Sequence, residues 1–370
     1  MNKTLGLYIH VPFCLSKCAY CDFYSLPDLS KKAAYTEALC SALRDAQSGV
    51  RERRVNTVFF GGGTPSLLEN GEIKAVMDAL FAFDLTEDCE ISMEVNPATA
   101  NEEKFAFLHS CGVNRISLGM QAASQRELCL LSRRHTPEEL EECVRALKRA
   151  GFSNFSLDLM YGLPHQTMED WENSLQSALA FEPAHLSLYA LTLSERVPLY
   201  REVQNLPSDE ECRAFYLRAV QIAEAHGLHQ YEISNFARPS CSCRHNLRYW
   251  QGEEYLGFGP AAASFYDGRR FTESESLSAF LQNPCGLLSR IEKEEQNSSE
   301  DARAERLMLS LRLKEGVEIA PFATPAFLKE VQALESHSLA TCADGRLALT
   351  PEGFFVSNEI ISRLLLSAGL

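Results

Sequence analysis

Three cysteines near the N-terminus could hold a reactive metal cluster. Cys14, Cys18 and Cys21 follow the spacing C-x3-C-x2-C, which places three thiolates within one short loop. A cubane of four irons and four sulfurs is closed by four protein ligands, so three thiolates leave one iron open. An open iron can bind a small molecule and pass it an electron. The spacing therefore indicates redox chemistry on a bound ligand.

Zinc is the main alternative use of these thiols. A structural zinc ion needs a fourth protein ligand. Asp22 and His10 are nearby, but neither gives a usual zinc-finger spacing, and no second cysteine pair lies at the expected distance. A disulfide is disfavoured, because the cysteine count is odd and no secretory context is visible. The spacing, together with the residues downstream of the loop, favours an iron–sulfur cluster.

Three successive glycines form a second candidate site in Phe60-Gly61-Gly62-Gly63-Thr64. Without side chains, the backbone can approach a ligand closely. Its amide and carbonyl groups could then hold the ammonium or carboxylate of an amino acid. A tight turn is the alternative use of such a triplet.

The elements that must position these residues alternate through the first 230 residues. Apolar runs predict strands at residues 5–11, 57–60, 90–95, 115–119, 155–160 and 185–191. Helical periodicity predicts helices at residues 31–47, 101–111, 137–150, 168–180 and 208–226. Six such repeats predict a parallel sheet with helices outside, which can close partly or fully into a barrel. Ligands of such a barrel lie at the C-terminal ends of its strands.

After about residue 235 this rhythm breaks, so we expect three parts. They are a core domain at residues 1–235, an irregular segment at 236–300 and a smaller C-terminal domain at 301–370. Residues 292–305 are acidic and polar, as in a linker or a solvated helix start. A short strand at 346–349 leads into a final helix at 354–366. The last part is therefore expected to be mainly helical and winged-helix-like.

The overall composition fits an ordinary α/β globular protein. The 370 residues are 45% hydrophobic and carry a net charge of −15, which argues against a nucleic-acid surface built on phosphate contacts. No apolar run approaches the roughly 20 residues of a membrane span. Thirteen cysteines without a signal peptide indicate a reducing cytosol, so we expect a cytoplasmic protein.

The residues around the cysteines resemble the radical S-adenosylmethionine (SAM) superfamily. The segments Leu7-Tyr-Ile-His-Val-Pro-Phe-Cys14 and Tyr20-Cys21-Asp22-Phe23 are similar to its anaerobic coproporphyrinogen III oxidase family, and in particular to the HemW haem chaperone subfamily. This resemblance implies a partial (β/α)6 barrel of the TIM type. It also implies a 4Fe–4S cluster on Cys14, Cys18 and Cys21, with SAM on the open iron, and an electron donor such as flavodoxin or ferredoxin.

The same resemblance implies a set of SAM-binding residues near the strand ends. They are Tyr8, Tyr20, Gly62, Gly63, Thr64, Glu94, Gln121, Arg133, Asp158 and Ala190. Chemically, carboxylates suit the ribose diol of SAM and Arg133 suits its carboxylate. Asp158 lies inside an apolar run, where an acid is costly without a partner. A buried salt bridge to an arginine such as Arg115 is the alternative explanation of Asp158.

A second cluster of chemically active residues lies at 241–250. Histidine and cysteine are haem axial ligands and aromatic rings pack on a porphyrin, although a structural histidine is the default. The run His245-Asn246-Leu-Arg-Tyr249-Trp250 matches the HNxxYW motif of the HemW subfamily, and the resemblance implies that His245, Asn246, Tyr249 and Trp250 bind haem. One departure is Ala263, where relatives typically carry a histidine.

The resemblance implies a haem chaperone that hands haem to an acceptor protein. The alternative is an oxygen-independent coproporphyrinogen III oxidase, and a third possibility is a radical SAM enzyme with another substrate. The oxidase pattern carries a fourth cysteine two residues after the third, where this chain has Phe23. The oxidase also has a longer N-terminal arm. Both features favour the chaperone, so we expect no coproporphyrinogen oxidase activity.

Overall fold

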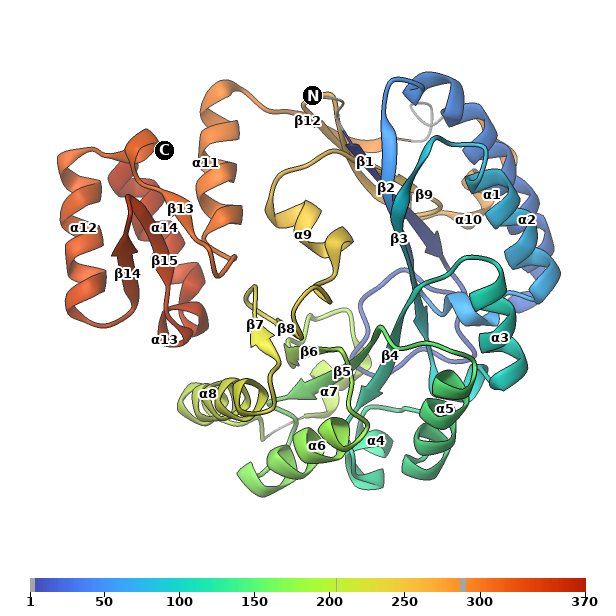
Figure 1. Ribbon diagram of the computed structural model, residues 1–370, viewed down its shortest axis with the longest axis horizontal. Coiled ribbons are helices and arrows are strands. Elements are labelled where there is room, and N and C mark those ends of the chain that lie inside the picture. Colours follow the sequence, from blue (N-terminus) through green and yellow to red (C-terminus); the bar gives the residue numbers. More distant parts are fainter. Residues whose placement is uncertain (1–3, 204, 287–290) are drawn as a thin grey trace.

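Six parallel strands form the centre of the protein, as expected. The computed structural model describes residues 4–203, 205–286 and 291–370. The strands lie side by side in chain order (Figure 1). They are β1 (Thr4–Val11), β2 (Arg54–Gly62), β3 (Leu85–Val95), β4 (Arg115–Gln121), β5 (Phe155–Tyr161) and β6 (His185–Ala190). All five pairings between them are parallel, so their C-terminal ends share one edge of the sheet.

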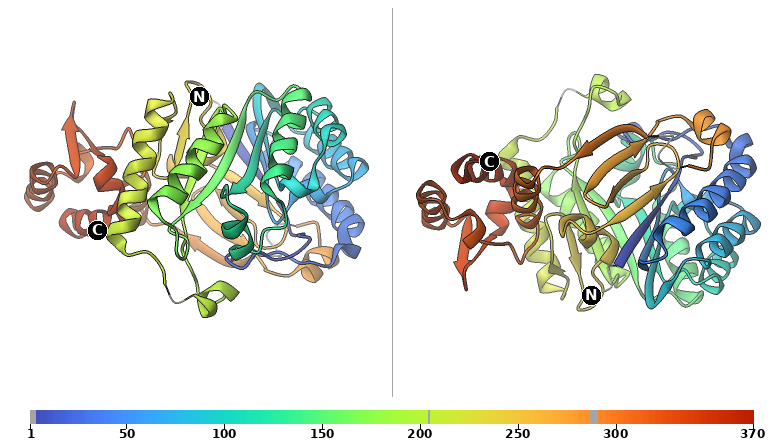
Figure 2. Two further views of the ribbon diagram at one scale, coloured as in Figure 1. Left: turned by 90° about the horizontal axis from the view of Figure 1, so that it is seen from below. Right: turned by 90° about the horizontal axis from the view of Figure 1, so that it is seen from above.

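Helices cover the outer face of this sheet, as the two views in Figure 2 show. They are α1 (Lys32–Gln47), α2 (Asn70–Leu80), α3 (Glu102–Ser110), α5 (Pro137–Arg149), α6 (Met168–Ala180) and α8 (Asp209–Ala225). Two short helices, α4 (Gln125–Leu130) and α7 (Pro198–Glu202), pack instead near Ala19 in the loop after β1. Helix α5 begins at a capping box of Thr136 and Glu139. Helix α2, which periodicity did not predict, begins at a similar box of Glu69 and Glu72.

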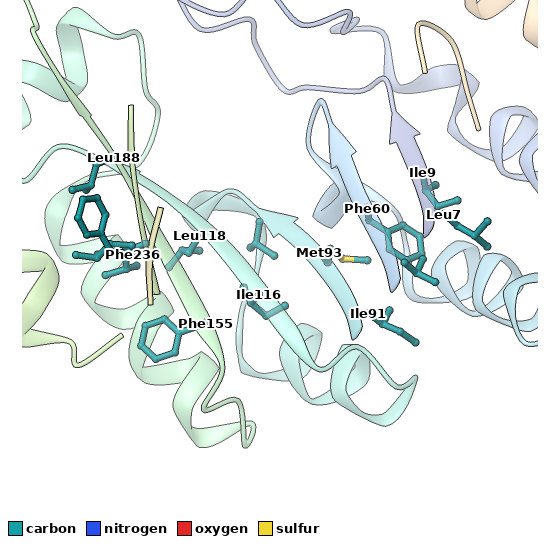
Figure 3. Packing of buried hydrophobic residues seen from close by; sticks show 14 of the residues in the cluster. Leu7, Ile9, Phe60, Ile91, Met93, Ile116, Leu118, Phe155, Leu188 and Phe236 are labelled. Atoms are coloured by element: carbon teal, nitrogen blue, oxygen red, sulfur yellow. The ribbon is translucent and has the colours of Figure 1, made fainter. Parts of the chain in front are cut away.

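Alternation along the strands separates an apolar face from a polar one. Leu7 and Ile9 of β1 are fully buried in the apolar core, together with Phe60 and Met93 of the next two strands (Figure 3). Because successive side chains point to opposite faces, Tyr8 projects into the concave interior instead. The interior positions of the other strands are largely polar, which leaves the concave side of the sheet for chemistry.

Residues 236–300 differ from the irregular segment that we expected. Strand β9 (Tyr255–Phe258) pairs in parallel with β1. The strands β10 (Ala263–Tyr266), β11 (Arg269–Glu273) and β12 (Ile291–Gln296) then extend the sheet antiparallel. At the other end, β8 (Asn235–Ala237) and β7 (His229–Gln230) continue from β6. Among the described residues, this one sheet therefore has twelve strands. The segment also holds helices α9 (Arg244–Trp250) and α10 (Leu277–Gln282). Short strands whose partners are distant in sequence leave little local periodicity.

The C-terminal residues form a small unit of helices and a three-stranded sheet, which lies at one end of the molecule (Figure 2). Its elements are α11 (Ser299–Ser310), β13 (Val317–Glu318), α12 (Pro325–Ser336), β14 (Ala340–Ala343), β15 (Arg346–Leu349), α13 (Pro351–Phe355) and α14 (Ser357–Ala368). An ion pair between Arg213 of α8 and Glu352 of α13 joins it to the core. Among the described residues, no helix combines the length and apolarity needed to cross a membrane.

Candidate functional site

The three cysteines lie in a loop that comes after the C-terminal end of β1. Backbone hydrogen bonds fix this loop: the Cys14 N–H donates to the Leu26 carbonyl at 3.1 Å, and the Ala19 N–H donates to the Leu131 carbonyl at 3.3 Å. A further bond of 3.2 Å joins the Cys21 N–H to the Cys18 carbonyl within the loop. All three thiols are free and partly exposed. The loop is therefore held by the fold while its sulfurs stay accessible.

Two polar side chains contact the sulfurs directly. The Thr64 hydroxyl donates to Cys14 Sγ at 3.6 Å. Arg133 donates from Nη1 to Cys18 Sγ at 3.7 Å and from Nη2 to the Gly119 carbonyl at 2.7 Å. Burial raises the pKa of the Cys21 thiol, and the neighbouring charges of Cys18 and Cys14 raise it further. Hydrogen-bond donors and a guanidinium beside the loop suit ligands that are negatively charged once a metal is bound.

The donor set fits a cluster better than a single ion. Among the described residues, no three histidine, cysteine, aspartate or glutamate side chains converge as one metal ion would require. In a cubane each thiolate binds its own iron, so the sulfurs need not meet at one point. Three thiols in one anchored loop are therefore compatible with the three-cysteine 4Fe–4S cluster that the spacing predicts.

The glycine triplet has a structural role in addition to the ligand-binding role that was expected. A Cβ on Gly62 would lie 2.5 Å from His10 Cε1, and Gly62 has a φ of 101° that favours glycine. A Cβ on Gly63 would lie 2.6 Å from the Phe13 carbonyl oxygen. The missing side chains therefore allow the end of β2 to approach β1 and the chain that follows β1. This close approach brings Thr64 to Cys14.

Two carboxyl groups face the interior beside the glycines. Glu94 Oε2 accepts from the Gly62 N–H at 3.2 Å. Burial, and then the negative charge of Asp158, raise the pKa of Glu94 from 4.5 to about 8, although the Gly62 bond opposes the shift. Glu94 therefore keeps its proton at neutral pH and can donate a hydrogen bond.

Serine hydroxyls hold the second carboxyl group, that of Asp158. Ser117 donates at 3.0 Å to both Asp158 oxygens, and Ser156 donates to Oδ1 at 3.2 Å. Burial raises the pKa of Asp158, whereas Ser187, Ser117 and the charge of Arg115 lower it. Arg115 thus acts on this carboxyl group through its charge, and the serines take the place of the expected salt bridge.

Tyrosines line the space between the loop and the carboxyl groups. His10 Nε2 donates to the Tyr24 carbonyl at 2.9 Å, so His10 Nδ1 accepts from the Tyr8 hydroxyl at 3.1 Å. Burial raises the pKa of Tyr20, which lies within electrostatic range of Arg133, Cys18, Cys21 and Asp158. Tyr189 is 42% exposed even though burial also raises its pKa.

The remaining expected SAM residues lie at the same edge of the sheet. Gln121 ends β4 with a φ of 68°, and a Cβ on Gly119 would meet Gln121 Nε2 at 2.9 Å and Arg133 Nη2 at 3.0 Å. Ala190 is exposed at the end of β6, opposite Tyr161. The structure therefore brings thiols, a guanidinium, an amide and two carboxyl groups together. This set can hold a ligand that carries an amino acid and a diol.

Helix α9, which carries the His245 motif, lies on the concave side of the sheet (Figure 1). The Glu90 carboxylate accepts from the N–H groups of Arg244 at 3.0 Å and His245 at 3.1 Å. His245 Nδ1 lies 2.9 Å from the Thr57 hydroxyl, and its Nε2 lies 2.8 Å from the Tyr249 hydroxyl. The side chain is fully buried, and burial lowers its pKa to about 3.

These contacts set a condition on the expected binding of haem by His245. Both nitrogens already have partners, so axial ligation in this conformation would require one bond to break. The His245 ring stacks on the Phe59 ring, with ring centroids 5.4 Å apart, and its centroid lies 6.5 Å from that of Tyr8. The histidine motif thus lies beside one of the expected SAM-binding residues.

The other motif residues are more accessible. Asn246, Tyr249 and Trp250 are partly exposed, and the Arg312 guanidinium lies 5.5 Å from the Trp250 ring centroid. Ala263, where relatives typically carry a histidine, is exposed at the start of β10. The adjacent Ser264 hydroxyl accepts from the Gly257 N–H at 2.9 Å, which secures the turn without that histidine.

Sequence reasoning missed the buried polar residues beneath helix α9. Thr57 and Glu90 contact His245, and His185 and Tyr231 contact each other through a bond of 2.8 Å. Polar residues at alternate positions of otherwise apolar strands were the available signal. Such residues are expected to find buried partners, because an unpaired buried polar group is costly.

Comparison with known proteins agrees with this arrangement. The Radical SAM superfamily matches residues 8–178, and the HemN C-terminal domain matches residues 297–356. The protein "Heme chaperone HemW" of Escherichia coli is 33% identical over 376 residues, which cover 98% of each chain. Its namesakes are 33% identical in Synechocystis sp., over 96% of this chain and 95% of the relative, and 31% identical in Bacillus subtilis, over 97% and 98%.

A solved structure shows the same fold at low sequence identity. It is the coproporphyrinogen III oxidase HemN from Escherichia coli, a radical SAM enzyme, which superimposes with a TM-score of 0.85. The superposition covers 99% of this chain and 90% of that chain, at 22% identity. This likeness confirms the α/β barrel with its small C-terminal unit.

Proposed function

This chain belongs to the radical SAM superfamily and, within it, to the HemW family, and from that membership we propose that it is a haem chaperone. The observation that carries the proposal is similarity along nearly the whole chain to proteins of that name. Membership of the superfamily implies a 4Fe–4S cluster and SAM. Phe23 supports the choice, because it is 67% exposed at the position where the oxidase pattern has its fourth cysteine.

We assign the cluster to Cys14, Cys18 and Cys21. When bound, the cluster and SAM together supply one-electron chemistry, for which a donor such as flavodoxin or ferredoxin would provide the electron. Arg133, which the Gly119 carbonyl orients, is placed to bind the carboxylate of SAM. The protonated Glu94 and the serine-held Asp158 are placed to bind its ribose hydroxyls.

Haem is proposed to dock at the accessible side of helix α9. Tyr249 and Trp250 offer partly exposed aromatic surface, and Asn246 lies beside them. Ligation by His245 then requires that its Nε2 leaves the Tyr249 hydroxyl. Release of one hydrogen bond costs about 1 kcal/mol, which is small compared with an iron–imidazole bond. Transfer to an acceptor protein would complete the function.

The test uses the anaerobically reconstituted protein. Haem titration should give a Soret band that His245→Ala shifts or abolishes, whereas Tyr249→Phe should keep it, because phenylalanine frees Nε2 without removing the ring. Incubation with SAM, a reductant and coproporphyrinogen III should yield no protoporphyrinogen IX. Robust formation of that product would replace the chaperone by the oxidase. Failure of wild-type protein to bind haem would also reject the proposal.

A further inference from the structure

A line of hydrogen bonds crosses the barrel interior from Asp158 to the start of helix α9. Asp158 Oδ1 lies 3.2 Å from the Ser156 hydroxyl, and that hydroxyl lies 2.8 Å from His185 Nδ1. His185 Nε2 lies 2.8 Å from the Tyr231 hydroxyl, which accepts from the Cys243 N–H at 3.2 Å. No residue of this line other than Asp158 belongs to the proposed SAM or haem sites.

The bond to Asp158 and the neutral histidine fix the direction of the side-chain bonds in the line. The Ser156 hydroxyl donates its single proton to Asp158 Oδ1, so it accepts from His185 Nδ1. The other nitrogen of the neutral ring, Nε2, then accepts from the Tyr231 hydroxyl. Burial and the charge of Arg115 lower the pKa of His185, so the ring stays neutral and keeps this tautomer. The line is thus a one-way series of donors that ends on Asp158.

The far end of the line holds the first turn of helix α9. Cys243 is the N-cap residue of that helix, and no side-chain hydrogen bond caps it. Its N–H is held by Tyr231, and its Sγ donates to Glu90 Oε1 at 3.7 Å. Tyr231 therefore holds the start of this helix together with Glu90, which accepts from the N–H groups of the next two residues.

The near end of the line is weakly held. Three hydroxyl groups donate to Asp158: Ser117, which shares its one proton between both carboxyl oxygens, Ser156 and Ser187. A ligand hydroxyl that binds Asp158 competes with them for the two oxygens. The Ser156 bond, at 3.2 Å, is longer than the two Ser117 bonds, at 3.0 Å.

We infer that Tyr231 and His185 are positioning residues that couple SAM binding at Asp158 to the seating of helix α9. The inference rests on the proposed SAM site. SAM displaces Ser156 from Asp158, the donor series loses its final acceptor, and Tyr231 loosens its hold on Cys243. Occupancy of the cofactor recess thereby eases the release of His245 from the barrel.

Hydrogen exchange of residues 243–250 in the cluster-loaded protein tests this coupling. In wild type, saturating SAM should speed exchange of these amides about fivefold or more, the lower end of typical coupling between two sites. In Tyr231→Phe the SAM effect should fall to less than about twofold. Should that variant not fold, Ser156→Ala, which interrupts the same line, must abolish the effect instead.

Tyr216→Phe is the matched control. Its hydroxyl bonds to the Ile233 carbonyl, beside the same segment but outside the line, so the wild-type SAM effect should persist. Titration calorimetry with SAM distinguishes a failure of the coupling from a failure of the proposed SAM site. SAM that binds wild type without changing exchange at α9 would overturn the coupling and leave the SAM site intact. Absence of SAM binding would overturn both the SAM site and the coupling. An undiminished effect of SAM on exchange in Tyr231→Phe would overturn the coupling alone.

Discussion

Replacing Glu94 by glutamine should remove a specific loss of stability at alkaline pH. Burial and Asp158 raise the pKa of Glu94 from 4.5 in the unfolded chain to about 8 in the folded protein. Between these values the folded state keeps a proton that the unfolded state has released. Stability therefore falls as pH rises from about 4.5 to about 8, and it is constant with respect to this group above that range.

The size of the effect is set by the two pKa values. Between pH 5.5 and pH 8.5, ionisation of Glu94 should cost wild-type protein about 3 kcal/mol of unfolding free energy. Glutamine cannot ionise, and its carbonyl oxygen can still accept from the Gly62 N–H. Glu94→Gln should therefore gain about 3 kcal/mol relative to wild type over the same interval.

Urea unfolding of the reduced, SAM-free protein at both pH values measures this gain. At each pH, the unfolding free energy of wild type is subtracted from that of the variant, which cancels the titration of all other groups. Glu103→Gln, on the exposed surface of α3, is the matched control for replacing one glutamate by glutamine. If the unfolding free energy of Glu94→Gln relative to wild type changes by less than about 1 kcal/mol between the two pH values, the argument that Glu94 is a buried, protonated carboxyl group is refuted.

Three further sets of substitutions test the packing and the ligands. Gly63→Ala should destabilise by more than about 2 kcal/mol through backbone overlap, whereas Gly71→Ala, whose Cβ would meet nothing within 4 Å, should be neutral or stabilising in urea unfolding. Arg248→Met should cost about 3 kcal/mol, because the buried guanidinium donates to the carbonyls of Thr4 and Glu254 and pairs with Glu253. The brown absorbance of reconstituted protein should survive Cys241→Ala but disappear on alanine substitution of any one of Cys14, Cys18 and Cys21. The opposite pattern would reject the ligand assignment.

The sequence alone determined the local features of the protein. The spacing of Cys14, Cys18 and Cys21 lies within one loop, and the six strands show their apolar runs over a few residues each. The start of α5 is set by Thr136 and Glu139, three residues apart. Each of these signals is short-range, because thiol spacing, side-chain alternation and helix capping all act between near neighbours in the chain.

Only the tertiary structure decided how these parts serve one another. Thr57 and His245 are 188 residues apart, yet their bond places the histidine motif inside the barrel, beside Tyr8. The glycines were recognised as a candidate site, but their need for close approach to His10 and Phe13 appears only when β2 is laid beside β1. Contacts between residues so distant in the chain leave no periodic or spacing pattern, since their energy depends on packing and burial that exist only in the folded state.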